Sequence, residues 1–517
     1  MAAITPPLEN QQLVTARLPL VLTEYARDIS AASGSSTSSG IVGVGVVGIM
    51  VVGLLTASTK DQRMVNAIPT KITNSMTGAQ TFYVSKRPGF ATLNTPSAGN
   101  PGSAIHVWAG QGSGTSVISA FGATNSTVYN GTSSLGSTTG KVYFIEDTLV
   151  GTTPNLTFVT DSNTAYFYPE GGALTQITDV DYPGNVAGQT TTGGFVFLDG
   201  YAFIMTGSGR VYNSDLNSMA NWTASSYISC NMSPDKGVGL ARYKDQIVAF
   251  GKQSTEFFQD VGNPTGSPLQ RTPQGFMNIG CVSQHTYDIM DDTIMWLGST
   301  DRSGVALYML EGLQAKRLST PTIETLLATT NPDNLTLSCI KVVGKSLVVI
   351  ASTSDLRTYV YCVEDDMWHE WNGAAQLWQH MHGIGSGIKY VYAVTEQNTT
   401  GKVYLINPTS FSFQDDSMNY TMLLQTSRFD VGNQKLKICR KLRLIGDIQD
   451  STATVDVSWS DDDYRTTSSG RSVDMSVDDA YLNGCGSFRR RSFSLSYTGS
   501  QPMRLEAIEI DYAQGIH

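Results

Sequence analysis

Three histidines lie close together in the sequence and could form a metal site. His380 and His382 are two positions apart, and His369 precedes them by eleven residues. On a strand, residues i and i+2 face the same side, so both imidazoles could bind one ion, with His369 as a third ligand from a neighbouring strand. The same stretch contains three tryptophans, Trp368, Trp371 and Trp378. So many aromatic residues favour a packed seam between sheets, and we predict no metal ligands here.

A glycine-rich motif near the N-terminus could bind a nucleotide. Gly43 to Gly48 reads G-V-G-V-V-G and matches the G-x-G-x-x-G fingerprint, whose glycines let the backbone approach a pyrophosphate at a helix N-terminus. The motif requires a preceding strand and a following helix. Here a Ser-rich tract precedes it, and Ile49 to Gly53 is a poor start for a helix. We therefore predict no cofactor site.

One acidic loop could belong to a carbohydrate-active protein. Ser460 to Thr467 reads S-D-D-D-Y-R-T-T, which is spaced like the Asp box of sialidases, Ser-x-Asp-x-Gly-x-Thr-Trp, although Tyr464 and Thr467 replace its Gly and Trp. An Asp box forms a turn through carboxylate-to-backbone bonds and supplies no catalysis itself. Glycoside hydrolysis needs two carboxylates across a sugar site, and 44 acidic residues do not indicate such a pair. We predict no catalytic residue and no enzyme activity.

Short polar turns between apolar alternating runs organise the middle of the chain, from about Thr115 to Pro408. These turns fall at Ala123-Thr124, Asp161-Ser162, Asp199-Gly200, Lys244-Asp245, Asp291-Asp292, Gly344-Lys345 and Ser386-Gly387, at spacings of 38 to 53 residues. A period near 45 is the length of one four-stranded blade, so the sequence predicts a β-propeller-like array. The period leaves six and seven blades equally open.

Composition and charge limit the classes of function. The 517-residue chain has 50 glycines and only 15% charged residues, which favours many short strands and turns. A net charge of -10 argues against a protein that coats nucleic acid with a basic face. The first twelve residues are polar and do not resemble a secretory signal, so we expect the protein to fold where it is made. The six cysteines are far apart in sequence, and we expect buried, reduced thiols.

An apolar insertion follows the Ser/Gly run from Ser33 to Gly40. Gly40 to Leu55 contains sixteen apolar or glycine residues, slightly fewer than the roughly 20 of a membrane-spanning helix. Its glycine and β-branched residues disfavour a helix in water. Three alternatives stay open: a buried or self-associating hairpin or loop, an apolar ring or plug formed where several copies meet, and a loop that inserts into a membrane.

Basic residues alternate with apolar ones near the C-terminus. Lys435, Lys437, Arg440, Lys441 and Arg443 alternate with leucine and isoleucine, and Arg489 to Arg491 precede a second apolar run. Both segments are typical of half-exposed strands with a basic outer face. A solvated or salt-bridged face, pairing between subunits, and contact with DNA phosphates all remain open.

Several short phrases follow one another in the order of a known family. Arg63 to Asn66, an Arg-x-Val-Asn strand, precedes the Pro-Gly-apolar turn Pro88 to Phe90; Val238 to Gly251 reads as a hairpin ending in Phe-Gly, followed by the Ser-Thr-Glu-aromatic strand Ser254 to Phe258. Further phrases continue this order: Gln274 to Cys281, Asp291-Asp292, Leu307 to Leu310, and a short helix from Ser319 to Leu327. From about Arg63 to its end, the chain resembles the tail hub or nozzle (packaged-DNA stabilisation) proteins of short-tailed bacteriophages. The insertion at Ser33 to Thr59 departs from that pattern.

The resemblance and the strand pattern together imply an all-β chain of three parts. We expect an N-terminal extended region with platform strands (1–98, with the apolar insertion at 33–59), a β-propeller-like domain (99–415) and a C-terminal β-sandwich platform (416–517) that pairs with N-terminal strands. We expect six copies of the insertion to narrow the lumen of a ring or to touch the host envelope.

The function that the resemblance implies is structural. We expect a virion protein, made in the host bacterial cytoplasm, that extends the portal-adaptor channel, retains packaged DNA and conducts it during ejection. The implied partners are five further copies in a homohexamer, the adaptor or head-completion ring on the portal, tail fibres or a needle, double-stranded DNA in the channel and, through 40–55, the host envelope. The alternatives are a propeller-type hydrolase of host-surface glycans and a receptor-binding tail protein.

Overall fold

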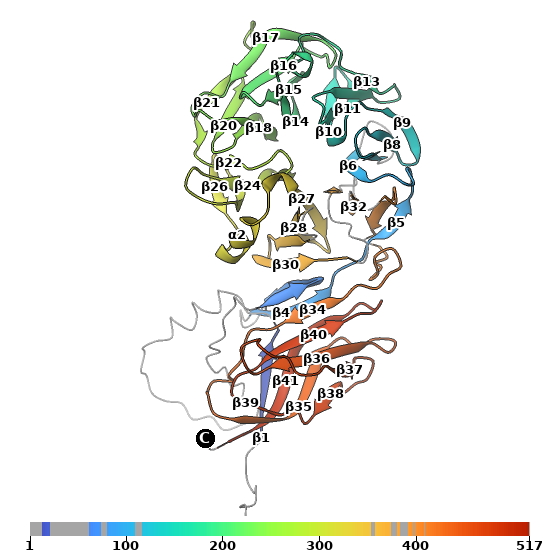
Figure 1. Ribbon diagram of the computed structural model, residues 1–517, viewed down its shortest axis with the longest axis vertical. Helices are drawn as coiled ribbons and strands as arrows, with labels where there is room; N and C mark the ends of the chain where they lie inside the picture. The colour runs from blue at the N-terminus through green and yellow to red at the C-terminus, as the bar shows by residue number, and fades with distance from the viewer. Residues whose placement is uncertain are drawn as a thin grey trace, which may run out of the picture. The chain divides into compact units, whose positions relative to one another are not determined.

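The computed structural model describes residues 13–20, 62–73, 80–108, 116–352, 357–373, 380–382, 391–395, 399–407 and 409–515 (Figure 1). Strands dominate these residues, joined by the short helix α2 (Pro321–Leu327) and the 3-10 turns η2 (Pro183–Asn185) and η3 (Pro332–Asn334). The chain divides into unit 1 (Met1–Gly89, Asp365–Trp371, Phe413–His517) and unit 2 (Phe90–Glu364, Asn372–Ser412). The prediction of an all-β chain is confirmed. The apolar insertion at 33–59 lies outside the described residues.

In the part of the chain that the structure describes, unit 2 consists of seven groups of antiparallel strands, or blades. A parallel bridge between Gly193 and Gly239 joins the third and fourth of them into one eight-stranded sheet. The first three blades contain β6 (Gly102–Trp108), β7 (Ser116–Phe121), β8 (Thr127–Asn130) and β9 (Ser133–Ser137); β10 (Val142–Val150), β11 (Thr153–Thr160), β12 (Ala165–Pro169) and β13 (Thr175–Gln176); and β14 (Thr191–Leu198), β15 (Tyr201–Thr206), β16 (Arg210–Ser214) and β17 (Trp222–Ser229).

The other four blades follow in chain order, except for one strand of the last. They contain β18 (Gly237–Tyr243), β19 (Gln246–Gly251), β20 (Thr255–Asp260) and β21 (Leu269–Met277); β22 (Gly280–Cys281), β23 (Tyr287–Met290), β24 (Thr293–Ser299), β25 (Ala306–Glu311) and β26 (Gln314–Arg317); β27 (Leu335–Val342), β28 (Lys345–Ser352) and β29 (Thr358–Cys362); and β31 (His380–His382), β32 (Val391–Val394), β33 (Val403–Ile406) and β5 (Ala91–Asn94).

The seven blades form a closed ring around a common axis. Contacts run from β6 to β10, β14, β18, β24, β27 and β31 and then back to β6, and the blades follow this order from blue through green and yellow to brown-orange in Figure 1. The first strand of the unit, β5, closes the ring by pairing with β33, where Tyr404 lies opposite Thr92. The predicted β-propeller is thus confirmed, and the described blades number seven. A domain boundary at 98 would separate β5 from its blade.

The predicted turns that lie in the described residues are hairpin turns at two different positions within their blades, whereas Ser386-Gly387 lies outside those residues. Asp199, Lys244 and Asp291 lie between the first two long strands of their blades and have φ angles of 48°, 57° and 52°. Asp and Asn accept this left-handed conformation more readily than most residues, whereas Lys244 adopts it in a tight two-residue turn. Ala123-Thr124 and Asp161-Ser162 instead join the second and third strands of the first two blades, so the period shifts between the second and third blades.

Unit 1 is a sandwich of two sheets built from both ends of the chain. One sheet contains β1 (Leu13–Pro19), β3 (Ala67–Thr73), β4 (Gln80–Lys86), β35 (Lys437–Gly446), β38 (Tyr481–Asn483), β39 (Ser487–Phe488) and β41 (Arg504–Gln514); the other contains β2 (Arg63–Val65), β30 (Met367–Trp371), β34 (Met422–Gln425), β36 (Thr454–Ser460), β37 (Arg471–Asp474) and β40 (Ser492–Tyr497). Leu442 and Ile510 from the first sheet and Leu424 and Val457 from the second share one buried apolar core. The predicted β-sandwich platform is confirmed.

One expectation about the basic strands is wrong at the start of β35. Lys437 is fully buried, whereas Ile438 is 39% exposed, which reverses the predicted sides. The pairing of β35 with β41 shifts by one residue between Cys439 and Lys441, a β-bulge that passes over Arg440. Because one extra residue switches the face of every later side chain, Arg440 and Lys441 both lie toward the outside, and the expected arrangement holds from Arg440 onward.

The closure of the ring can be tested at Gly102 of β6. A Cβ atom at this glycine would lie 2.5 Å from the Cβ of Val394 in β32, so Gly102→Val should destabilise unit 2 by about 1–3 kcal/mol through overpacking. Gly304→Val is the matched control, because a Cβ at Gly304 would meet no atom within 4 Å. Urea unfolding, monitored by hydrogen exchange of the amides in β6 and β32, measures the stability of unit 2 in both variants. Equal stability of the two variants would contradict the close packing described here.

Candidate functional site

A buried ion pair forms the centre of the first candidate site, in unit 1. Arg87 and Asp415 both have 0% side-chain exposure. Their contact is bidentate, with Nη1 to Oδ1 at 3.0 Å and Nη2 to Oδ2 at 2.6 Å. Although burial opposes the charge, Asp415 and Tyr420 raise the pKa of Arg87 above its usual value. A planar guanidinium matches a carboxylate in this geometry better than an ammonium group would.

Polar and aromatic groups complete a shell around this pair, which we call the Arg87 clasp. Asn66 accepts a hydrogen bond from Arg87 Nε at 2.9 Å and donates its amide to the carbonyl of Thr421. The ring of Tyr420 stacks on the guanidinium, with Arg87 Cζ 3.9 Å from the ring centre, and the Tyr420 hydroxyl donates to the Arg87 carbonyl. Burial, with the adjacent Arg87 charge, lowers the pKa of Lys86 to about 8. These contacts satisfy the buried donors of Arg87, as a desolvated charge requires.

The clasp explains the two short phrases of the sequence that precede the propeller. Asn66 ends the first phrase, with φ at 54°, and Arg87 directly precedes the second, Pro88 to Phe90. At Gly89 a Cβ atom would lie 2.1 Å from the carbonyl oxygen of Gln414. Only glycine allows this approach, which brings the strand leaving unit 1 against the one that returns to it. Asp415 had no signal in the sequence, since it lies in a short polar loop 328 positions from Arg87.

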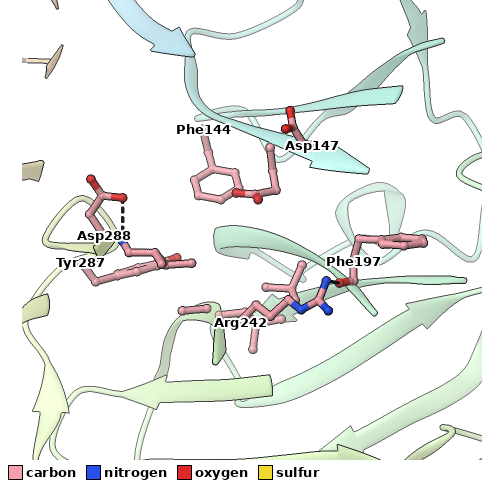
Figure 2. Close-up of a pocket in the computed structure, with 11 residues that line it drawn as sticks. Phe144, Asp147, Phe197, Arg242, Tyr287 and Asp288 are labelled. Atoms are coloured by element: carbon pink, nitrogen blue, oxygen red, sulfur yellow. Dashed lines mark hydrogen bonds between the residues drawn. The ribbon is translucent and has the colours of Figure 1, made fainter. Parts of the chain in front are cut away.

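The second candidate site is a cavity of about 90 Å³ between the inner strands β10, β14, β18 and β23 of unit 2 (Figure 2). Phe144, Phe197 and Tyr287 supply apolar and aromatic walls, and Glu146 and Asp288 supply carboxylates. Figure 2 shows the guanidinium of Arg242 turned toward the carbonyl of Phe197, 3.3 Å away. The cavity therefore combines acidic groups with one basic side chain that is held by the backbone.

The carboxylates of this cavity are strongly affected by their surroundings. Burial raises the pKa of Glu146 to about 7; His106 and Arg242 oppose this shift, and Asp147 and Asp288 add to it. Burial also raises the pKa of Asp288 to about 6, against hydrogen bonds from the N–H groups of Cys339 and Ile289. Raised carboxylate pKa values in a cleft are a known signal of functional sites. The composition of the strands did not reveal this pair, because alternating acidic residues also occur on exposed strand faces.

The size of the cavity restricts what these carboxylates can do. A volume near 90 Å³ holds a few water molecules, whereas sites for small organic ligands usually have roughly 300–1,000 Å³. Asp288 is also engaged structurally, since its Oδ2 accepts the N–H of Cys339 at 2.7 Å and its Oδ1 that of Ile289. The cavity can hold water or a small cationic group beside Glu146. It cannot enclose a sugar unit between two carboxylates.

The acidic loop from Ser460 to Thr466 is a turn in unit 1, outside the propeller. Asp462 accepts hydrogen bonds from both the N–H and the hydroxyl of Thr466, which lower its pKa to about 2. Asp461 forms a bidentate pair with Arg491, with both contacts at 2.7 Å. Asp463 pairs with Arg428 and Arg490. This loop is therefore a structural hairpin, in which Asp462 binds Thr466 and the other two carboxylates pair with arginines.

The same contacts decide part of the question about the basic strands. Lys441 and Arg443 both bind Asp479, and Arg443 also pairs with Glu509. Lys437 donates to the carbonyls of Asn433, Lys435 and Arg489 at 2.7 to 3.1 Å. The salt-bridged interpretation holds for Lys441, Arg443, Arg490 and Arg491. Pairing between subunits and contact with DNA remain predictions.

The predicted histidine and glycine motifs are only partly described. His369 is buried on β30 of unit 1, and His380 and His382 belong to β31 of unit 2. The described ranges contain no group of three or more His, Cys, Asp or Glu residues that could hold a metal ion. Gly43 to Gly48 lies outside them. Among the helices of the described residues, none is long and apolar enough to cross a membrane.

Together, the fold and these sites define an all-β protein with a seven-bladed propeller, whose buried charges are bound to other groups of the chain. Its sequence matches, over residues 130–403, the family described as the β-propeller of bacteriophage P22 Gp10, Phage_stabilise. The match covers more than half of the 517 residues. The chain belongs to this family of phage stabilisation proteins. The match confirms the family resemblance seen in the sequence.

Solved structures with a similar fold are distant in sequence. BBS1N, in a crystal structure with ARL6DN, is 13% identical with a TM-score of 0.39, covering 63% of this chain and 99% of that one. The N-terminal domain of Nup159 is 10% identical with a TM-score of 0.37, covering 67% and 98%. The RRP9 WD40 repeats are 12% identical with a TM-score of 0.37, covering 62% and 98%. No curated protein matches the chain.

The Arg87 clasp can be tested by removing its carboxylate. Asp415→Ala should lower the stability of unit 1 by about 3–5 kcal/mol, because it leaves a buried guanidinium without its counter-ion. The double variant Arg87→Met/Asp415→Leu should lose less, since it removes both charges. Arg17→Met is the control, because Arg17 is 59% exposed and its pair with Glu506 should contribute at most about 1 kcal/mol. Urea unfolding, monitored by hydrogen exchange of the amides in β4 and β41, measures the stability of unit 1 in the three variants. A loss of stability for Asp415→Ala that is no larger than that of the control would contradict the clasp.

The cavity predicts a pH dependence of stability in unit 2. An unfolded Glu titrates near 4.3, whereas the pKa of Glu146 is about 7 in the fold, so the folded chain binds the extra proton between these values. Stability should therefore fall as the pH rises from 5 to 8. Glu146→Gln should gain stability relative to the wild type over this range by on the order of 2 kcal/mol. Unfolding free energies at pH 5 and 8 test this, with Glu311→Gln, an exposed carboxylate, as the control. Parallel pH profiles for the wild type and Glu146→Gln would refute it.

Proposed function

We propose that this protein is the hub, or nozzle, of a short phage tail. In this role it extends the channel of the portal and adaptor, retains packaged DNA and conducts it during ejection. The observation that carries the proposal is the match of residues 130–403 to the P22 Gp10 propeller family. The platform of N- and C-terminal strands supports it, because the hub resemblance implies such a platform beside the propeller.

The proposed mechanism is mechanical and electrostatic. Six copies form a ring below the adaptor and enclose the DNA exit channel. A net charge of -10 per chain supports a wall that repels DNA phosphates and so lets the duplex slide. The pairing of Lys441, Arg443, Arg490 and Arg491 with acidic groups supports the same mechanism, because these cations are already neutralised within the chain. In a closed ring, every copy makes the same lateral contacts with its neighbours, so no copy leaves its contact surface exposed.

The two alternative functions are less well supported. A glycan hydrolase needs a site that encloses a sugar between two carboxylates, and the cavity beside Glu146 is too small for one. The Asp-box-like loop, whose carboxylates are bound to Thr466 and to arginines, offers no second site. A receptor-binding propeller would act at the periphery of the particle, typically as a trimer, and no observation on these residues favours it.

The proposal predicts the stoichiometry of assembly with the adaptor ring. Native mass spectrometry of the purified chain, mixed with the portal-adaptor complex of its own phage, should detect six copies bound per complex. The portal alone is the control, because the adaptor should supply the docking surface and the portal should bind none. A chain that binds no adaptor, or binds as a trimer, would contradict the hub.

A further inference from the structure

Two cysteines that are distant in sequence meet in the sandwich of unit 1. Cys439 lies on β35, and Cys485 follows β38 at the edge of the same sheet. Both are free thiols, and they are 1% and 0% exposed. The Cys485 N–H donates to the Cys439 carbonyl at 3.0 Å, and the Cys439 N–H donates to the Gly486 carbonyl at 2.9 Å. The two residues are therefore direct neighbours across the sheet.

This arrangement fits the geometry of a disulfide. Cys439 exchanges one backbone hydrogen bond with Cys485 and one with Gly486, so both residues lie opposite it, as in a one-residue bulge. Facing residues of antiparallel strands have Cα atoms roughly 4.5–5.5 Å apart, within the range of about 4.4–6.8 Å that disulfides span. Both side chains are buried in the same apolar core. A bond between the sulfurs therefore needs rotation of the side chains and no movement of the strands.

The surroundings of the two thiols divide their roles. The Cys439 thiol, helped by the charges of Arg471 and Arg491, lowers the pKa of Cys485 to about 7, although burial opposes this. Arg471 Nη1 lies 3.9 Å from Cys485 Sγ. The neighbouring Cys485 thiol, together with burial, raises the pKa of Cys439. Cys485 thus supplies the thiolate, which is the reactive form of the residue, and Cys439 keeps its proton.

An oxidant can reach the pair from the edge of the sheet. β38 has three residues and β39 has two, and both pair with β35. Short edge strands with few hydrogen bonds open locally at a much smaller free-energy cost than the whole domain. Opening of the segment from Tyr481 to Phe488 exposes Cys485 while the rest of the sandwich stays folded.

We propose that Cys439 and Cys485 form an intramolecular disulfide when the protein meets a low-molecular-weight disulfide such as glutathione disulfide. The Cys485 thiolate attacks one sulfur of the oxidant and displaces the first thiolate. Cys439 then loses its proton and attacks the Cys485 sulfur, which displaces the second thiolate. The protein gives up two electrons and two protons, and the oxidant becomes two thiols. The new bond fastens the edge segment to β35.

The compartment in which the bond forms follows from the proposed virion role. Cytosolic thiol systems keep such cysteines reduced, whereas a released particle meets oxidising surroundings. That the bond forms only after the particle is released rests on the proposed function, whereas the chemistry of the purified chain does not depend on it. Failure of the hub assignment would therefore leave the cysteine result unchanged.

Incubation of the folded full-length chain with glutathione disulfide tests the bond. After alkylation under denaturing conditions, mass spectrometry should show four free thiols where the reduced chain has six, and proteolysis should yield one cross-linked peptide pair containing Cys439 and Cys485. Dithiothreitol should restore both thiols. Cys439→Ser should retain no cross-link, whereas Cys281→Ser, which removes a buried thiol of unit 2, should retain it.

Three outcomes would overturn the proposal. The first is that all six thiols persist in the folded chain although the same reagent oxidises the unfolded chain. The second is a glutathione adduct that stays on Cys485 without passing to Cys439. The third is a cross-link that involves another cysteine. The peptide map of the wild type gives its result without any variant, so a misfolded Cys439→Ser chain would not prevent the test.

Discussion

The bidentate pair between Arg87 and Asp415 is the interaction on which unit 1 depends. Both charges lie out of water, so they stabilise the fold only because Asn66 and the Pro88 carbonyl accept hydrogen bonds from Arg87 and the Tyr420 ring stacks on its guanidinium. A hydrophobic pair of similar volume could be equally stable, but it would not fix the orientation of one side chain relative to the other. The geometry of the guanidinium therefore selects how the strand leaving unit 1 meets the strand that returns to it.

Unit 1 also illustrates how a propeller is inserted into another domain. β1 lies against β41, with Leu13 opposite Ala513, so the two ends of the described chain share one sheet. Between β4 and β34 the chain forms all seven blades and contributes β30 to the sandwich. Sheets of this kind close only after contacts across hundreds of residues, which makes them slow to form. Within unit 2, β5 plays the corresponding role, since it comes first in the chain and completes the last blade.

Local patterns allowed much of the fold to be predicted, but not the contacts between distant segments. Turn residues such as Asp199 and Lys244 determine hairpins through their own φ angles, and Thr320 caps the predicted short helix by accepting from the N–H of Ile323. The partner of Arg87, the meeting of Cys439 with Cys485 and the raised pKa of Glu146 all depend on long-range packing, which no local pattern encodes. Lys437 was placed on the wrong side because a bulge of one residue leaves no mark in an alternating sequence.

The assignment to a short phage tail is tested most directly by a cryo-electron microscopy map of the particle that carries this chain. The account predicts six copies arranged around the tail axis below the adaptor, each with a seven-bladed propeller and a two-sheet platform, enclosing a channel wide enough for duplex DNA. Copies found only at the periphery, or arranged around a threefold axis away from the channel, would contradict it.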